Sequence, residues 1–214
     1  MTVNFPEYVV IEGPIGVGKT SLARRLAETL DVELMLESAG DNPFLKAFYE
    51  NPESGALPVQ LHFLFQRIKQ VETLRQSDLF RPAHISDFLI EKDRLFAKAT
   101  LNEAEFNLYQ QVYERMVLET PVPNLVIYLQ AKPEILLKRI LERGIDYEKH
   151  IDEKYLKKIS DAYIDFFYHY NASPLLIVNT ENFDLAGSAR NYNVLLEYIE
   201  KLPPGRHYFN PQEL

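Results

Sequence analysis

The chain has 214 residues, a formal net charge of −8 and no cysteine, and 46% of its residues are apolar. The apolar share is sufficient for a buried core and excludes a disordered chain, and the length suits one domain over 1–214. Without cysteine there is no disulfide framework, thiolate zinc site or thiol nucleophile. The acidic balance without a basic patch argues against a nucleic-acid partner.

No segment predicts export or a membrane partner. The sequence contains no run of 18 apolar residues, and its N-terminal segment lacks the basic and apolar regions of a signal peptide. We therefore expect a cytoplasmic protein that acts on small molecules.

Short apolar runs alternate with helical periodicity along the chain. The runs that predict strands are 7–12, 32–37, 83–87, 124–130 and 174–179. The periodic segments that predict helices are 20–30, 57–76, 88–98, 103–118, 133–143, 153–170 and 188–201. This alternation predicts an α/β fold, with a five-stranded parallel sheet and helices on both faces. The tail from Pro203 to Leu214 contains three prolines, so we expect it to lie irregularly on the surface.

A phosphate-binding motif lies between the first predicted strand and the first predicted helix. The pattern G-x-x-x-x-G-K-[ST] is matched at every fixed position. Backbone N–H groups of such a loop close around a polyphosphate, and the helix N-terminus adds a favourable dipole. Lys19 is expected to reach the outer phosphates, and the Thr20 hydroxyl to ligate Mg²⁺. The predicted nucleotide-binding residues are Gly13, Pro14, Ile15, Gly16, Val17, Gly18, Lys19, Thr20 and Ser21.

Carboxylates end the next two predicted strands. Glu37 closes the second strand and Asp87 the third. In open parallel sheets, ligands bind beyond the carboxyl ends of the strands. We therefore expect Glu37 and Asp87 to lie beside the phosphate loop, although an isolated acid at a strand end is more often a helix cap.

With these motifs the chain resembles the deoxynucleoside kinase family, and most of all its bacterial deoxyadenosine/deoxyguanosine kinase branch. The resemblance covers about residues 7–180. It implies a P-loop kinase fold with a short arginine-bearing lid at about 139–152, ATP and Mg²⁺ as cofactors, a deoxynucleoside substrate and a homodimer. The motifs that carry it, in order, are 12–20, Leu-Glu-Ser at 36–38, 41–49, 60–67, 87–97 and Arg-Ile-Leu-Glu-Arg-Gly at 139–144.

The resemblance assigns catalytic roles to a few of these residues. Glu37 corresponds to the general base that takes the proton of the 5′-hydroxyl. Lys19 holds phosphate, while Asp87 supports the metal beside Thr20 and also borders the substrate. Arg139 and Arg143 lie four residues apart near a helix end, and the resemblance makes them the lid clamp on the transferring phosphoryl group. The alternative interpretation is that the two arginines are cations that interact favourably with the dipole at the C-terminal end of the helix.

The resemblance also assigns the nucleoside contacts. Gln60 and Arg67 lie seven residues apart, which is two helical turns, so they share a face of the helix. The resemblance implies that this face reads the base and that Asp93 pairs with the arginine. The alternative is that these residues form a surface amide and a surface ion pair, because such pairs are common. Tyr49 and Glu148 correspond to the pair that holds the 3′-hydroxyl.

Aromatic residues near these motifs are candidates for stacking on the base. They are Phe63, Phe65, Phe88 and Phe96. Phe96 is selected because it matches the Phe-Ala ending of the family motif.

The sequence departs from the family in two places. Better-known members have an arginine directly after the acid of the third strand, where Phe88 stands here, and a second lid arginine where Ile145 stands. Lys92 or Arg94 is then the candidate replacement for the first missing charge. The segment is also one residue shorter, which leaves the register across 87–96 open.

Two other functions compete with this reading. A thymidylate-type monophosphate kinase would share the fold and the lid but would need a cationic site for the acceptor phosphate. A nucleotide-binding module without transfer activity is the second alternative, since Asp184 and Gly187 match D-x-x-G, although far too late in the chain for a GTP switch. The base preference is left open by the residues, and the branch favours purines.

Overall fold

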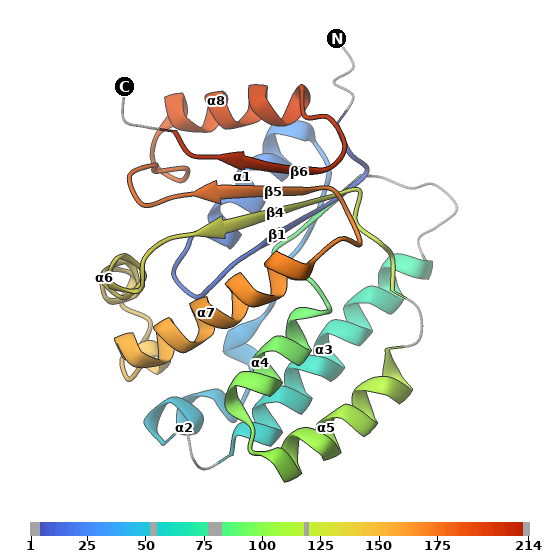
Figure 1. The fold of residues 1–214 in the computed structure, drawn as a ribbon, viewed down its shortest axis with the longest axis vertical. Coiled ribbons are helices and arrows are strands. Elements are labelled where there is room, and N and C mark those ends of the chain that lie inside the picture. Colours follow the sequence, from blue (N-terminus) through green and yellow to red (C-terminus); the bar gives the residue numbers. More distant parts are fainter. Residues whose placement is uncertain (1–4, 52–54, 77–82, 118–119, 212–214) are drawn as a thin grey trace.

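The computed structural model describes residues 5–51, 55–76, 83–117 and 120–211. Its centre is a parallel sheet with the strand order β2-β3-β1-β4-β5-β6 (Figure 1). Every neighbouring pair of these strands is parallel, as the alternation of elements predicts. The strands are β1 (Tyr8–Glu12), β2 (Glu33–Met35), β3 (His84–Ser86), β4 (Leu125–Gln130), β5 (Leu175–Asn179) and β6 (Arg206–Phe209).

The sixth strand corrects the prediction of a five-stranded sheet. The expected irregular tail instead turns at Gly205, where φ is 118°, and then pairs with β5. Phe209 is 9% exposed and packs into the core, while Tyr208 points outward at 66% exposed. This alternation is a strand pattern, but it covers only the four residues of β6, and prolines lie close to it on both sides.

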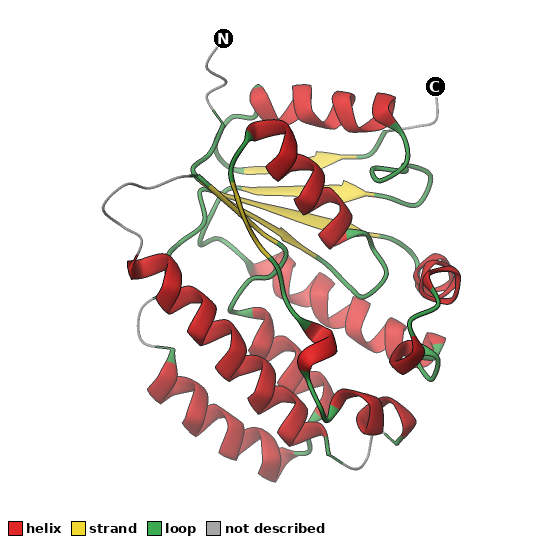
Figure 2. Cartoon of the chain, turned by 180° about the vertical axis from the view of Figure 1, so that it is seen from behind, coloured by secondary structure: helices red, strands yellow, loops and turns green. Residues whose placement is uncertain are grey.

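Helices cover both faces of the sheet (Figure 2). The structure has α1 (Lys19–Leu30), α2 (Leu45–Glu50), α3 (Ala56–Gln76), α4 (Lys92–Thr100), α5 (Glu103–Met116), α6 (Pro133–Arg143), α7 (Glu153–His169) and α8 (Ala189–Glu200). Two 3₁₀ turns, η1 (Ala39–Asp41) and η2 (Asp146–Glu148), join them. Pro133 opens α6, and Gly144 caps its C-terminal end in the left-handed conformation.

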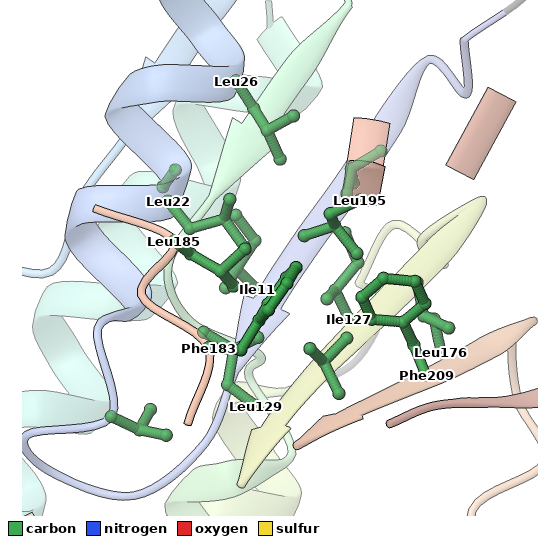
Figure 3. Packing of buried hydrophobic residues seen from close by; sticks show 14 of the residues in the cluster. Ile11, Leu22, Leu26, Ile127, Leu129, Leu176, Phe183, Leu185, Leu195 and Phe209 are labelled. Carbon is green, nitrogen blue, oxygen red and sulfur yellow. The ribbon is translucent and has the colours of Figure 1, made fainter. Parts of the chain in front are cut away.

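Alternation along the strands divides the core between the two faces. Ile11 packs with Leu22 and Leu26 of α1 and Leu195 of α8 (Figure 3). The neighbouring residue Val10 faces the opposite way, into a cluster with α4 and α7. A third cluster joins α3, α4 and α5. Of these three helices, α5 lies farthest from the sheet (Figure 1).

The segment after β3 differs from its prediction. A helix was expected over 88–98, but α4 begins only at Lys92. Ser86 Oγ accepts from the N–H of Phe88 and donates to its carbonyl, which fixes a turn at this point. The short helix α2 was not predicted at all. Among the described residues, no helix combines the length and the apolar character that a membrane crossing requires.

Candidate active site

The phosphate-binding loop lies between β1 and α1. Gly13 and Gly16 have positive φ angles of 149° and 82°. A Cβ on Gly16 would lie 2.8 Å from the carbonyl oxygen of Leu136 in α6, so only glycine allows the loop to pass this close to that helix. The N–H groups that begin α1 remain available to an anion.

The lysine of the loop is held by backbone carbonyls. Lys19 Nζ donates to the carbonyl oxygens of Gly13, at 2.7 Å, and Pro14, at 3.2 Å. Burial and then the repulsion of Lys92 lower the pKa of Lys19 to about 8, although nearby carboxylates act in the opposite direction. The lysine is thus a cation beside the loop that an anionic ligand would stabilise.

The carboxyl ends of β1, β2 and β3 converge as predicted. Asp87, which is 2% exposed, accepts the hydroxyl proton of Thr20 on Oδ2. Its Oδ1 accepts from the backbone N–H of Glu37 at 2.8 Å. Asp87 therefore connects the start of α1 to the segment after β2. No group of three or more His, Cys, Asp or Glu suited to a metal occurs within the described residues.

A cavity, the central cavity, opens at this edge of the sheet. It extends from the phosphate loop to α2, α3, α4 and the turn η2. Besides Lys92, the site residues that line it are Ile15, Gly16, Lys19, Thr20, Glu37, Tyr49, Gln60, Arg67, Asp87, Phe96, Arg143 and Glu148. The other predicted loop residues are Gly13, Pro14, Val17, Gly18 and Ser21, which form the loop and the first turn of α1.

Glu37 is held between two cations in this cavity. Its Oε1 accepts from Arg67 Nη2, and its Oε2 lies 3.1 Å from Lys92 Nζ. Burial acts to raise the pKa of Glu37, but Arg67, Lys92 and Lys19 outweigh it and lower the pKa to about 2. Glu37 is thus an ionised carboxylate near neutral pH, and each of its two oxygens is held by a cationic side chain.

Glu12 is a site residue that the sequence analysis missed. It is fully buried and accepts from the N–H of Gly13 at 2.9 Å, the N–H of Leu89 at 2.8 Å and the hydroxyl of Tyr163 at 2.8 Å. It also lies 3.8 Å from Lys92 Nζ. Glu12 thereby joins the phosphate loop, the turn after β3 and α7. The signal was an acid at the end of an otherwise apolar strand.

The structure separates the two candidates for the missing arginine. Lys92, the first residue of α4, is 2% exposed and lies between Glu12 and Glu37. Arg94 is exposed, and its guanidinium lies 5.7 Å from the ring centre of Tyr113, outside the cavity lining. Lys92 therefore supplies the cation beside Glu37. We call Glu12, Glu37, Arg67, Lys92 and Asp93 the carboxylate cluster.

The predicted base-reading residues lie together on the α3 side. Gln60 and Arg67 are each 3% exposed, so the alternative of a surface amide and surface ion pair is excluded. Arg67 Nη1 donates to Asp93 Oδ1, which sets the register left open by the sequence. Burial raises the pKa of Asp93 to about 6, against the opposing effect of Arg67. Arg67 Nε and Asp93 Oδ2 have no hydrogen-bond partner within the described residues.

The stacking candidates separate by position. Phe96 and Phe63 line the central cavity, and the Arg67 guanidinium lies 5.0 Å from the ring centre of Phe63. Phe65 is 49% exposed on the outer face of α3, and Phe88 is buried at 1% without lining the cavity. Phe65 and Phe88 are therefore not placed to stack on a ligand in this cavity.

The predicted sugar-contacting pair also lines the central cavity. Glu148 is 7% exposed, so it is not a solvated loop acid. Its Oε2 accepts from Arg143 Nη2 at 2.6 Å. Tyr49 is partly buried and packs near Tyr155, with ring centres 6.0 Å apart, and burial raises the pKa of its hydroxyl well above the usual value. These side chains close the cavity on the side of η2.

Arg139 does not share the position of Arg143. Its guanidinium donates to the hydroxyl of Thr180 at 3.1 Å and to the Thr180 carbonyl, directly after β5. Arg139 is outside the lining of the central cavity, whereas Arg143 is part of it. Burial lowers the pKa of Arg139. A spacing of four residues therefore gives the two arginines a common helix face but not the same partners.

The D-x-x-G match has a local structural explanation. Asp184 Oδ1 accepts from the N–H groups of Ala186 and Gly187, both at 2.9 Å. This is a side chain that closes a turn before α8. Arg25 of α1 holds the same segment by donating to the carbonyls of 185, 186 and 188.

Proteins that resemble this chain in sequence and in structure are deoxynucleoside kinases. The family model described as deoxynucleoside kinase matches residues 9–203. A deoxyguanosine kinase of Bacillus subtilis is 36% identical over 85% of this chain and 89% of its own, and a deoxyadenosine kinase of Lactobacillus acidophilus is 30% identical over 92% and 96%. The solved deoxyadenosine kinase of M. mycoides, with dCMP and dCDP bound, superposes with a TM-score of 0.80 at 22% identity, covering 91% of this chain and all of that one.

Proposed function

This chain belongs to the deoxynucleoside kinase family, and we propose that it transfers the γ-phosphoryl group of ATP to the 5′-hydroxyl of purine deoxynucleosides. The observation that carries the proposal is the position of Glu37. Its ionised carboxylate faces the central cavity, on the same sheet edge as the phosphate loop. Relatives named for deoxyguanosine and deoxyadenosine support purines as the acceptors.

The donor triphosphate would lie in the phosphate loop. Residues 13–21 supply backbone N–H groups, and Lys19 would leave the carbonyls of Gly13 and Pro14 for phosphate oxygens. The contact between Thr20 and Asp87 fits Mg²⁺ binding through a hydroxyl backed by a carboxylate, with phosphate oxygens completing the ligands. When bound, Mg²⁺ would neutralise charge on the phosphates.

Glu37 would accept the proton of the attacking 5′-hydroxyl. A pKa of about 2 makes it a weak base, yet this suffices because the proton leaves only as the oxygen bonds to phosphorus. Lys92 and Arg67 fix both oxygens of Glu37, so the carboxylate is already oriented before the substrate arrives. Lys92 would also stand near the transferring group as a cation.

The nucleoside would fill the rest of the cavity. Gln60, Arg67 and Asp93 would read the base, because buried amide, guanidinium and carboxylate groups present both donors and acceptors. Phe96 would stack on the base. Tyr49 and Glu148 would hold the 3′-hydroxyl.

The remaining assignments concern the whole chain. We propose that Arg143 closes over the phosphates with a lid at about 139–152, and that 1–214 forms a single domain. We further propose a homodimer in the cytoplasm, as the family resemblance implies. Light scattering of the purified chain tests the dimer, and half the expected mass would refute it.

A phosphate-transfer assay tests the function. Mg-ATP is offered with the four deoxynucleosides and, separately, with their monophosphates. We expect transfer to deoxyadenosine or deoxyguanosine ahead of the pyrimidine nucleosides. A monophosphate kinase is disfavoured because Arg67 and Lys92 already bind carboxylates and leave no free cation pair for an acceptor phosphate among the described cavity residues. Transfer only to a monophosphate would overturn the proposal.

A further inference from the structure

Thr100, the last residue of α4, contacts a residue that lines the central cavity. Its Oγ1 lies 2.7 Å from the carbonyl oxygen of Phe96 and 3.2 Å from Nε2 of Gln60. A hydroxyl carries a single proton. Two oxygens at 2.7 Å require that proton between them, so Thr100 donates to Phe96 and has only a lone pair to offer Gln60.

This contact determines the orientation of the Gln60 amide. A flipped amide would direct Oε1 at Thr100 Oγ1, whose proton already binds Phe96, and would bring two acceptors together. Gln60 is 3% exposed, so water does not replace the lost bond freely. Nε2 therefore stays toward Thr100, which leaves Oε1 and the second Nε2 proton for a ligand.

A fixed amide distinguishes purines by the group at position 6. A 6-amino purine has a donor at position 6 and an acceptor at N1, whereas a 6-oxo purine has an acceptor at position 6 and a donor at N1. A freely turning amide pairs with both patterns, because its oxygen and nitrogen exchange places. A fixed amide pairs with one pattern and leaves the other with buried unpaired groups.

We propose that Thr100 is a positioning residue that locks the Gln60 amide and so sets the preference between 6-amino and 6-oxo purine deoxynucleosides. The proposal rests on the proposed function, with Gln60 in contact with the base. Thr100 itself lies outside the central cavity lining and acts through Gln60.

The test compares Thr100→Val, which removes the hydroxyl at nearly constant shape, with Thr100→Ser, which keeps it. The substrates are deoxyadenosine and deoxyinosine, because they differ only in the hydrogen-bonding pattern at position 6 and N1. We expect wild type and Thr100→Ser to have the same ratio of the two kcat/KM values, different from one. Thr100→Val should move that ratio toward one by about tenfold or more.

A double-mutant cycle separates the lock from a general effect on folding. In a Gln60→Leu background, Thr100→Val should leave the ratio unchanged because no amide remains to be locked. A mere loss of stability lowers both kcat/KM values together and does not change their ratio. If Thr100→Val does not fold, as judged by its Tm, Thr100→Ala takes its place.

An unchanged ratio in a folded Thr100→Val enzyme would overturn the proposal. If wild type phosphorylates no nucleoside, the proposed function fails, and calorimetric Kd values for the same two nucleosides then test the lock without turnover. Absence of binding to both nucleosides would overturn the lock as well.

Discussion

The two sides of the phosphate loop are built from different kinds of contact. On the acceptor side, the carboxylate cluster consists of buried charged side chains that pair with one another. Beside α1, which begins at the end of the phosphate loop, the segment 180–188 is held by Arg25 and Arg139, which donate to backbone carbonyls and to the Thr180 hydroxyl; we call this segment the donor side. The acceptor side depends on the identity of several charged side chains, whereas the donor side depends mainly on the path of the backbone.

This difference determines how far a substitution should act. Removing one charge from the carboxylate cluster leaves a buried partner unpaired, which is costly in a poorly hydrated site. Removing a donor to a backbone carbonyl costs less, because the carbonyl left without that donor carries no net charge. We therefore expect large catalytic effects on the acceptor side and small, separable effects on the donor side.

Glu37→Gln should have the largest effect. The amide keeps the shape and an acceptor for Arg67 but cannot take the 5′-hydroxyl proton, so kcat should fall by about 10²–10⁴-fold. Steady-state kinetics and a calorimetric Kd for the deoxynucleoside measure the two parts separately. The Kd should change little. A kcat within threefold of wild type would remove Glu37 from the mechanism.

Lys92→Met should come next, with Arg94→Met as its matched control on the same helix. Methionine keeps the length of the Lys92 side chain but leaves Glu12 and Glu37 without their shared cation, so kcat should fall by about 10–10²-fold. Arg94→Met should be close to wild type because Arg94 lies outside the cavity lining. Equal losses in both variants would show that the charge of α4 acts at a distance, and would contradict a contact role for Lys92.

The sequence predicted those parts of the site that local patterns determine and missed those that depend on long-range contacts. The phosphate loop, Glu37 and Asp87 were predictable because a local motif and the carboxyl ends of strands place them. Lys92 could only be named together with Arg94, since the turn at Ser86 that sets the start of α4 is a tertiary detail. Glu12 escaped because two of its partners, Leu89 and Tyr163, come from distant segments of the chain.

The fold shows a similar limit. Strand and helix alternation was sufficient for the parallel sheet, whereas β6 was missed because a strand of four residues close to prolines carries too short a pattern. Arg139 was paired with Arg143 from their spacing, yet a spacing of four gives a shared face and not a shared partner. The carbonyl of Thr180, which separates them, lies 41 residues away in sequence.

Arg139→Ala and Arg143→Ala sharpen the comparison between the two sides. Arg143 lines the central cavity, so its loss should lower kcat by about tenfold or more. Arg139 holds the segment after β5, so its loss should raise KM for ATP by a few-fold and leave kcat nearly unchanged. Kinetics with each substrate varied in turn measure both values. A kcat loss in Arg139→Ala as large as that in Arg143→Ala would place both arginines on the transferring group.

Asp184→Ala should have the smallest effect and tests the most isolated motif match. The change removes the acceptor of two backbone N–H groups in an exposed turn, so the free energy of unfolding should fall by about 1 kcal/mol, or about 2–4 °C in Tm. Because the turn supports only the segment before α8, kcat and both KM values should stay within twofold. Asp184→Asn keeps an acceptor oxygen and should restore Tm. A loss of nucleotide binding in Asp184→Ala, at unchanged Tm, would mean that this aspartate serves a ligand and that the donor side depends on a side chain after all.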